Sequence, residues 1–355
     1  MKQSIFSTVA IAAAISFTAC KKENKTMVMP HVFDQKVKTF FDANAPKYEA
    51  FTIDATTGGM LLTSKGTKIN FPANAFKKAN GQLVTGSVTV QVKDIHKASD
   101  MLLGNRPTEA GGQMLVSYGE MTVKANQGAD ELQLNAPAQV VVPAAPKAGA
   151  NGQFLREVPM WSGDSAVTYT INGNDHENLP VTLSQTGYVP RGVNWVQNGN
   201  FAVNNNNGTS TFNLDSLGVW RNCDALMGDP RPKTTVLGYF SNQWNSATST
   251  SYMGGEPSML FFKVKQQNTL VKLYNKIVNA PAGKEGLLSY QNSFPIGIEG
   301  TFLAITFKAN KIYAEMQDVT VGAPASGKTY YGVTFNLTEV TEAQLLSLIQ
   351  QLNTK

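Results

Sequence analysis

Residues 87–93 read SVTVQVK, and this alternation of valine with polar side chains decides the fold class. In an extended chain, Val88, Val90 and Val92 face one side, and the polar residues between them face the other. One apolar face and one polar face are typical of an antiparallel strand that covers a core on one side only. The stretch therefore predicts a fold built from half-buried β-strands.

The same period of two recurs along most of the chain. Similar runs occupy residues 68–71, 114–124, 132–134, 140–142, 235–240, 259–265, 302–307, 311–316 and 331–337, with turn signals such as Asn80-Gly81 between them. Short strands at regular spacing indicate β-sandwiches. We expect an all-β protein of two or three tandem antiparallel β-sandwich units with a short C-terminal α-helix.

Helical patterns appear near both ends of the chain. Thr341 and Gln344 have the spacing of a capping box, and Asp34 is placed to cap a short first helix. The apolar faces comprise Val37, Phe40 and Phe41 in the first helix, and Leu345, Leu348, Ile349 and Leu352 in the last. We expect the C-terminal stripe to dock on the last sandwich.

The first nineteen residues have the composition of a signal peptide. Lys2 is their only charged side chain, residues 5–15 form a mainly apolar stretch, and Thr18 and Ala19 precede Cys20. A helix needs about 20 apolar residues to span ~30 Å of hydrocarbon, so this segment is too short to cross a membrane. Residues 1–19 are therefore predicted to be a cleaved signal peptide.

The end of this segment, Phe17-Thr18-Ala19-Cys20, resembles the lipobox of bacterial lipoproteins, although Phe17 replaces the usual leucine. The resemblance implies that Cys20 is diacylated and becomes a lipid anchor, with residues 20–50 forming a lipidated tether and short helix. Lys21, in place of an aspartate after the cysteine, implies sorting to the outer membrane, where the protein would face the periplasm or the cell surface. The alternative is an ordinary signal peptide with a chance cysteine.

The second cysteine and the net charge bear on disulfide bonding and on the class of partner. The chain has two cysteines, so Cys223 has no intramolecular disulfide partner if Cys20 carries lipid, and we expect a small buried hydrophobe. The formal net charge of +5 in 355 residues is spread without any block of like charge. This pattern does not indicate a nucleic-acid partner.

Four motifs connect residues 51–143 to a known type of domain: Thr57-Gly58-Gly59, GTKINFPANAF at 66–76, NGQLVTGSVTVQV at 80–92 and DMLLGNRPTEAGGQML at 100–115. These motifs resemble a domain of bacterial envelope lipoproteins that is similar in layout to the β-sandwich of ankyrins and zonula occludens proteins. The resemblance implies an interaction or scaffolding unit with no catalytic residue and no cofactor. After a linker at 143–152, we expect a small β unit over 153–230 and a C-terminal β-sandwich with its terminal helix over 233–355.

Residues 322–329 read GAPASGKT, which satisfies the phosphate-loop pattern. That chemistry needs a helix after the loop, so that backbone N–H groups converge on phosphates. Here residues 330–337 alternate as a strand. We therefore predict a hairpin loop and no nucleotide partner.

Other candidate sites are short. Asp175-His176-Glu177 are adjacent on a loop and predict a solvated turn rather than a metal site. Asp94 and His96 share one face of a strand end and are placed for a hydrogen bond. Ser165 and Ser216 each follow Asp and precede an aliphatic residue, a pattern that resembles bacterial O-glycosylation sites.

The chain is therefore predicted to be no enzyme but a lipid-anchored, non-catalytic interaction or scaffolding module of the cell envelope, with a protein or glycan partner. The alternative is a glycan-binding lipoprotein of a polysaccharide-uptake system, in which Trp161 and Trp195, with Trp220 and Trp244, would stack on sugars. Core packing is the competing interpretation of each tryptophan. A hydrolase would require a cleft with converging titratable groups.

Overall fold

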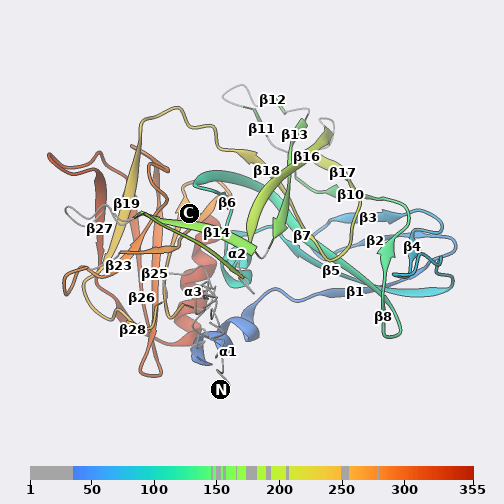
Figure 1. The fold of residues 1–355 in the computed structure, drawn as a ribbon, viewed down its shortest axis with the longest axis horizontal. Helices are drawn as coiled ribbons and strands as arrows, with labels where there is room; N and C mark the ends of the chain where they lie inside the picture. The colour runs from blue at the N-terminus through green and yellow to red at the C-terminus, as the bar shows by residue number, and fades with distance from the viewer. Residues whose placement is uncertain are drawn as a thin grey trace, which may run out of the picture. The chain divides into compact units, whose positions relative to one another are not determined.

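The computed structural model describes residues 35–144, 147–148, 153–154, 157–164, 166–172, 182–188, 193–204, 208–248, 256–277 and 280–355. The signal peptide, Cys20 and Asp34 lie outside these residues, as do Ser165 and the Asp175-His176-Glu177 turn. Within the described part, the prediction of an all-β fold is confirmed: the strands form several antiparallel sheets and the α-helices are short (Figure 1).

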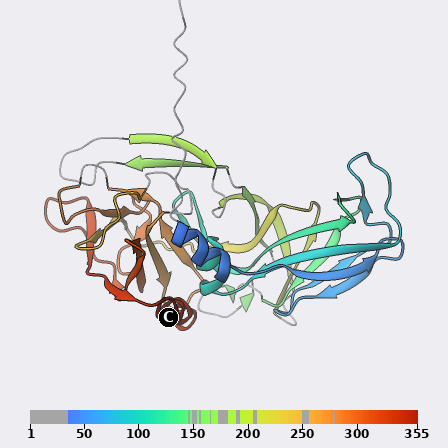
Figure 2. The ribbon, with the colours of Figure 1, turned by 90° about the horizontal axis from the view of Figure 1, so that it is seen from below.

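The largest sheet has ten strands along its main path, and every pair in it is antiparallel. Their order is β1 (Glu49–Asp54), β5 (Ser87–Ile95), β7 (Gln113–Gln127), β18 (Trp220–Leu226), β13 (Glu157–Asp164), β16 (Asn194–Asn204), β17 (Thr209–Leu214), β10 (Ala138–Val142), β3 (Lys68–Phe71) and β2 (Gly59–Leu62). The short strands β6 (Glu109–Ala110) and β8 (Asp130–Glu131) also pair with β7. β1 and β2 stand at opposite ends of this order, yet only four residues join them, and Asp54 at the end of β1 forms a bridge with Gly58, just before β2. The sheet therefore folds back on itself (Figure 2).

The core of this sheet contains the residues that the opening stretch predicts. Val88, Val90 and Val92 are fully buried, and Cys223 of β18 is buried in the same cluster. Phe71 and Phe76 stack with ring centroids 5.0 Å apart. Phe76 begins β4 (Phe76–Lys77), which pairs with β9 (Gln133–Leu134).

The segment predicted as a separate small β unit, 153–230, adds its strands to this sheet. β17 pairs with β10, and β18 pairs with β7. β14 (Ala166–Asn172) pairs with β15 (Thr182–Tyr188), and β11 (Lys147–Ala148) with β12 (Gln153–Phe154), as separate ribbons. The predicted linker at 143–152 therefore does not separate two sheets. β7 and β10 precede it in the chain, and both pair with strands that follow it, namely β18 and β17.

Two further sheets face each other in the C-terminal part. One has the order β22 (Asn275–Lys276), β23 (Gly286–Leu288), β19 (Lys233–Phe240) and β24 (Phe294–Pro295), with β27 (Tyr330–Phe335) parallel to β19. The other has the order β21 (Leu270–Leu273), β20 (Ser258–Val264), β25 (Glu299–Lys308), β26 (Lys311–Thr320) and β28 (Thr338–Val340). The apolar core between them includes Phe240, Phe262, Phe294, Phe302 and Phe335.

Helices cover the outer face of the sheet that contains β20 and β25. They are α1 (Gln35–Asn44), α2 (Ala98–Gly104) and α3 (Glu342–Gln351), the last extended by a short 3-10 turn (Leu352–Thr354). The predicted apolar face of α1 is buried there, as are Leu345, Ile349 and Leu352 of the C-terminal stripe, whereas Leu348 is only partly buried. The capping box of α3 is present. α1 and α2 come from the N-terminal third of the chain. The C-terminal sandwich is therefore covered partly by helices that lie far from it in sequence (Figure 1).

Among the described residues, none of the helices combines the length and the apolar character needed to cross a membrane.

Candidate functional site

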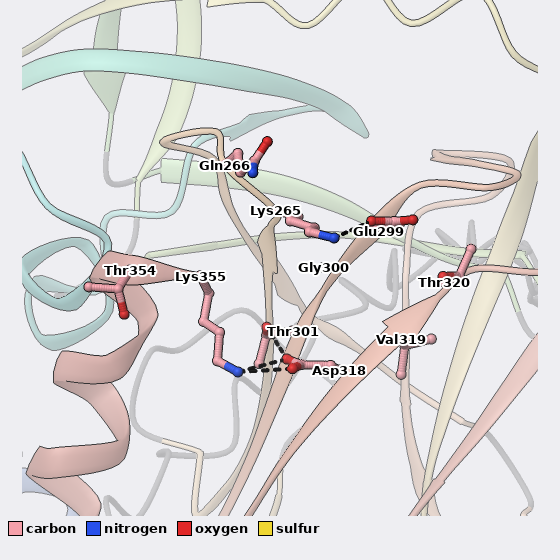
Figure 3. A pocket seen from close by; sticks show the side chains of 10 residues that line it. All are labelled: Lys265, Gln266, Glu299, Gly300, Thr301, Asp318, Val319, Thr320, Thr354 and Lys355. Atoms are coloured by element: carbon pink, nitrogen blue, oxygen red, sulfur yellow. Dashed lines mark hydrogen bonds and ion pairs between the residues drawn. The ribbon is translucent and has the colours of Figure 1, made fainter.

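A pocket of 420 Å³ lies where the C-terminus approaches β25 and β26 (Figure 3). Lys265 Nζ is 2.7 Å from Glu299 Oε2, and Lys355 Nζ is 2.9 Å from Asp318 Oδ2. Thr301 also donates a hydrogen bond of 2.5 Å to Asp318, and these bonds from Thr301 and Lys355 lower the pKa of Asp318. Each charge in this pocket therefore already has an opposite charge beside it.

A second pocket, of 450 Å³, is lined by tyrosines. Its walls are formed by Tyr239 of β19, Tyr330 and Tyr331 of β27, Lys284, Lys328 and three small residues, Ala323, Ala325 and Gly332. The ammonium of Lys284 lies 4.8 Å from the centroid of the Tyr239 ring, a cation–π distance. We call this site the tyrosine pocket; the described residues that line it combine aromatic surface with two lysines.

The GAPASGKT loop forms part of the tyrosine pocket, through Ala323, Ala325 and Lys328. The strand predicted after it is confirmed as β27, and no helix follows the loop. The prediction of a hairpin is wrong: β26 pairs with β25 and β28, whereas β27 pairs with β19. The loop therefore crosses from one sheet of the sandwich to the other.

Titratable groups also meet in the interior, between β7 and β18. Asn222 donates a hydrogen bond of 2.6 Å from Nδ2 to Asp224 Oδ2 and accepts one of 3.2 Å from Ser117. The register shifts between Asn222 and Asp224, which is a β-bulge. Glu120 and Asp224 are fully buried, and among the described residues both Glu120 carboxyl oxygens and Asp224 Oδ1 have no hydrogen-bond partner.

Burial sets the protonation of these acids. It raises the pKa of Asp224 to about 8, against the opposing effect of the hydrogen bond from Asn222. Burial, reinforced by the charge of Asp224, raises the pKa of Glu120 well above its ordinary value. Neither acid lines the pockets described above, so this carboxyl pair is a feature of the interior and not of a cleft.

The hydrogen bond between Asp94 and His96 is present, at 2.8 Å between Oδ1 and Nε2. Asp94 also accepts a bond of 2.7 Å from Thr63. Burial tends to raise the pKa of Asp94, but the hydrogen bonds, chiefly from His96, lower it overall. No group of three or more His, Cys, Asp or Glu side chains in the described part of the chain is arranged to hold a metal ion.

The structure contradicts the proposed sugar-stacking role of Trp161 and Trp195. Their exposed fractions are 4% and 3%, and the indole N–H of each donates a hydrogen bond within the protein. Trp161 donates a bond of 3.0 Å to the carbonyl of Asp224, and Trp195 donates one of 2.8 Å to that of Pro107. Core packing is therefore the correct interpretation, because a stacking platform must expose a ring face.

Ser216, the described member of the two glycosylation candidates, is half-buried. Its Oγ donates a bond of 2.9 Å to Asp215 and accepts one of 2.6 Å from Arg221. Cys223 is 1% exposed, and burial raises the pKa of its thiol well above the usual value. A neutral, enclosed thiol fits the expected small hydrophobe.

The chain matches no protein-family model, no curated protein and no solved structure.

Proposed function

We propose that this protein is a lipid-anchored component of the cell envelope, held at the outer membrane, whose folded part acts as a non-catalytic interaction or scaffolding module. The observation that carries the proposal is Cys20, which ends a short apolar segment and precedes two lysines. Several acyl chains on one residue give a stable anchor, at ~0.8 kcal/mol per buried CH₂. The motifs in residues 51–143, similar to those of a scaffolding β-sandwich, support the interaction role.

An exposed apolar edge in the same region also supports it. β2 ends the strand order of the large sheet, and its Met60 and Leu62 are 65% and 53% exposed on one face. Residues two apart on a strand point the same way, so the two side chains form one apolar surface. Apolar surface at a sheet edge favours contact with a partner protein.

The anchor is tested by replacing Cys20 with Ser in the full chain, expressed in a bacterium that processes lipoproteins. We expect the wild type to incorporate an alkyne-tagged palmitate and to sediment with outer-membrane vesicles. C20S should lose the label and move to the soluble fraction. The matched control is Cys223→Ala, which removes the buried cysteine and should keep both label and membrane association. Membrane association of unlabelled C20S would overturn the proposal.

The tyrosine pocket favours a second candidate function, a glycan-binding lipoprotein of a polysaccharide-uptake system. The supporting observation is that Tyr239, Tyr330 and Tyr331 line this pocket. Aromatic rings of this kind can stack on sugar rings, a role that the buried Trp161 and Trp195 do not have. A soluble form of the chain that retains glycan affinity, and loses it when these tyrosines are replaced, would distinguish this candidate from a purely protein-binding module.

A further inference from the structure

We propose that Lys47, Lys93 and Lys124, which gather around Tyr48, form a surface that binds the phosphate headgroups of an anionic membrane. We call these three lysines the lysine patch. The inference rests on the proposed membrane location and goes beyond the lipid anchor, because it gives the folded part its own contact with the bilayer.

The pairing of β5 with β7 places two of these lysines on one face of the large sheet (Figure 1). Lys93 lies opposite Thr122, two residues before Lys124, so the two lysines are diagonal neighbours. The adjacent residues Val92 and Val123 are buried in the core of this sheet. Because side chains alternate between the two faces of a strand, Lys93 and Lys124 both point to the outer face.

Tyr48 brings the ammonium groups together. It directly precedes β1, the strand that pairs with β5. The centroid of its ring lies 4.6 Å from Lys93 Nζ and 5.6 Å from Lys124 Nζ. The preceding residue, Lys47, is exposed, and its Nζ donates a hydrogen bond to the backbone carbonyl of Asp42. Two ammonium groups therefore share one half-buried aromatic ring, and a third is on the adjacent residue.

The positive charges of the lysine patch repel one another. Burial lowers the pKa of Lys93, and the charges of Arg106, Lys47 and Lys124 lower it further. Arg106 also lies over Trp220 and acts on a buried acid, so we do not count it in the patch. An anion bound beside these lysines would offset their mutual repulsion.

The acids nearest to the lysine patch in sequence have other partners. Glu49 accepts hydrogen bonds of 2.8 and 2.9 Å from the backbone N–H and the hydroxyl of Ser64. Asp94 is buried and is bonded to His96 and Thr63. In the part of the chain that the structure describes, no ion pair joins a lysine of the patch to an acid. The patch is therefore open to an external anion.

The location of the lysine patch favours a lipid surface as that anion. The patch lies on the outer face of a sheet, and none of its lysines lines either of the two pockets described above. Lys47 closely follows α1, the first described element after the segment that leads from Cys20. Lysines near an anionic leaflet bind it electrostatically, and tyrosine rings suit the boundary between apolar chains and water. An anionic bilayer therefore matches both kinds of side chain.

The test is vesicle flotation of the mature chain, residues 20–355 with Cys20→Ser, which retains every described element and carries neither leader nor acyl chains. Vesicles at millimolar lipid contain phosphatidylcholine alone or mixed with phosphatidylglycerol. We expect partition onto the anionic vesicles, about tenfold weaker partition onto the neutral ones, and loss of binding in high salt, which screens the charges. Equal partition onto both kinds of vesicle, or partition onto neither, overturns the proposal.

Charge-matched variants locate the contact. Replacing all three lysines of the patch with glutamine should weaken partition onto anionic vesicles by about tenfold or more, because each lysine contributes about fivefold. The control removes the same charge from the C-terminal sandwich and should change partition far less; it replaces Lys233, Lys276 and Lys308. Unfolding temperatures show that both triple variants fold. Equal losses in the two would show that net charge alone drives binding and would overturn the proposal.

A further arm separates a lipid surface from a soluble phosphate. Glycerol phosphate, the soluble part of the same headgroup, is added to the bound protein at constant ionic strength. We expect it to release no protein, since the patch binds many headgroups weakly and does not enclose one. Release at millimolar concentration would show a discrete site for a small phosphate and would overturn the proposal.

The lysine patch and the lipid anchor fail separately. Three lysines bind a membrane reversibly and do not replace the acyl chains, so washed membranes still release C20S. If the wild type is labelled with palmitate but C20S shows no preference for anionic vesicles, the patch is wrong and the anchored module stands. If C20S prefers anionic vesicles but Cys20 of the wild type is not acylated, the anchor is wrong.

Discussion

At the scale of single residues, buried acids determine how stability depends on pH. Asp224 and Glu109 each have a pKa of about 8 in the folded protein, because burial disfavours the charged form. In the unfolded chain such groups titrate near pH 4. Between these values the folded protein retains protons that the unfolded chain has released. The free energy of unfolding therefore falls as the pH rises from about 4 to about 8, and this contribution levels off above that range.

We predict that replacing Asp224 with Asn makes the free energy of unfolding less dependent on pH across this window. Each such acid contributes up to about 1.4 kcal/mol per pH unit. Urea unfolding at pH 5.5 and pH 7.5 measures the slope in D224N and in the wild type. The control, Glu131→Gln, alters an exposed acid of β8 and should keep the wild-type slope. An unchanged slope in D224N would mean that Asp224 is ionised in the fold.

A second residue-scale prediction concerns Gly58, where the chain turns between β1 and β2. Its φ is +74°, and a Cβ there would lie 2.2 Å from the carbonyl oxygen of Phe71. Gly86 has a similar φ of +77° but open space around a Cβ. We expect Gly86→Ala to cost about 1–2 kcal/mol from backbone strain alone, and Gly58→Ala to cost clearly more. Urea unfolding compares the two. Equal losses would show that contact with Phe71 has no effect.

At the scale of elements, the capping box gives a prediction for α3. Thr341 Oγ1 accepts a hydrogen bond of 3.2 Å from the backbone N–H of Gln344. In return, the side-chain oxygen Oε1 of Gln344 accepts one of 2.8 Å from the backbone N–H of Thr341. Thr341→Ala should lower the free energy of unfolding by about 1 kcal/mol, whereas Thr341→Ser should retain most of it. Thermal unfolding measures both variants. Equal stability of the two would show that the cap does not hold the helix.

Local periodicity predicted those elements that local sequence determines. The strand over 87–93, the strand after the GAPASGKT loop and the cap of α3 were all predicted, because their signals lie within a few residues. α2 was missed: it has seven residues, and its N-cap, Lys97, makes no capping side-chain bond. A helix so short owes its stability to the surfaces that it covers, and these lie far away in sequence.

The features of the interior and of the candidate site that were not predicted from the sequence depend on pairings between distant strands. Glu120 and Asp224 lie on strands whose register cannot be derived from either strand alone. Trp161 and Trp195 occupy strand positions that periodicity assigns to a face, but it does not say whether another layer covers that face. The tyrosine pocket joins Tyr239 to Tyr330 through a parallel pairing of β19 and β27. Its only local signal was the adjacent pair Tyr330-Tyr331.

At the scale of the whole described molecule, the N-terminal and C-terminal parts share one apolar cluster. Phe40 of α1 and Met101 of α2 are buried with Leu303 and Phe307 of β25. Hydrogen bonds also cross between the parts: Asn268 donates bonds of 3.0 Å to the carbonyls of His96 and Ser117. The large sheet and the C-terminal sandwich are therefore expected to unfold together.

We predict a single urea transition for the full chain, identical by tryptophan fluorescence and by far-ultraviolet circular dichroism. Phe40→Ala should lower its midpoint, at a cost of about 3–5 kcal/mol, without splitting it. Leu83→Ala removes an apolar side chain that is 48% exposed and serves as the control. Two separate transitions in the wild type would show that the parts are independent.

The packing of α1 also has a mechanical consequence. The chain that leads from Cys20 enters the described fold at α1, and Phe40 there contacts Phe307 with ring centroids 5.7 Å apart. Tension on the N-terminal end would therefore load a helix seated on the C-terminal sandwich before it reached the strands of the large sheet. Resistance to such a pull is a matter of unfolding rate. Under such tension, the contact between Phe40 of α1 and Phe307 would be the first to break.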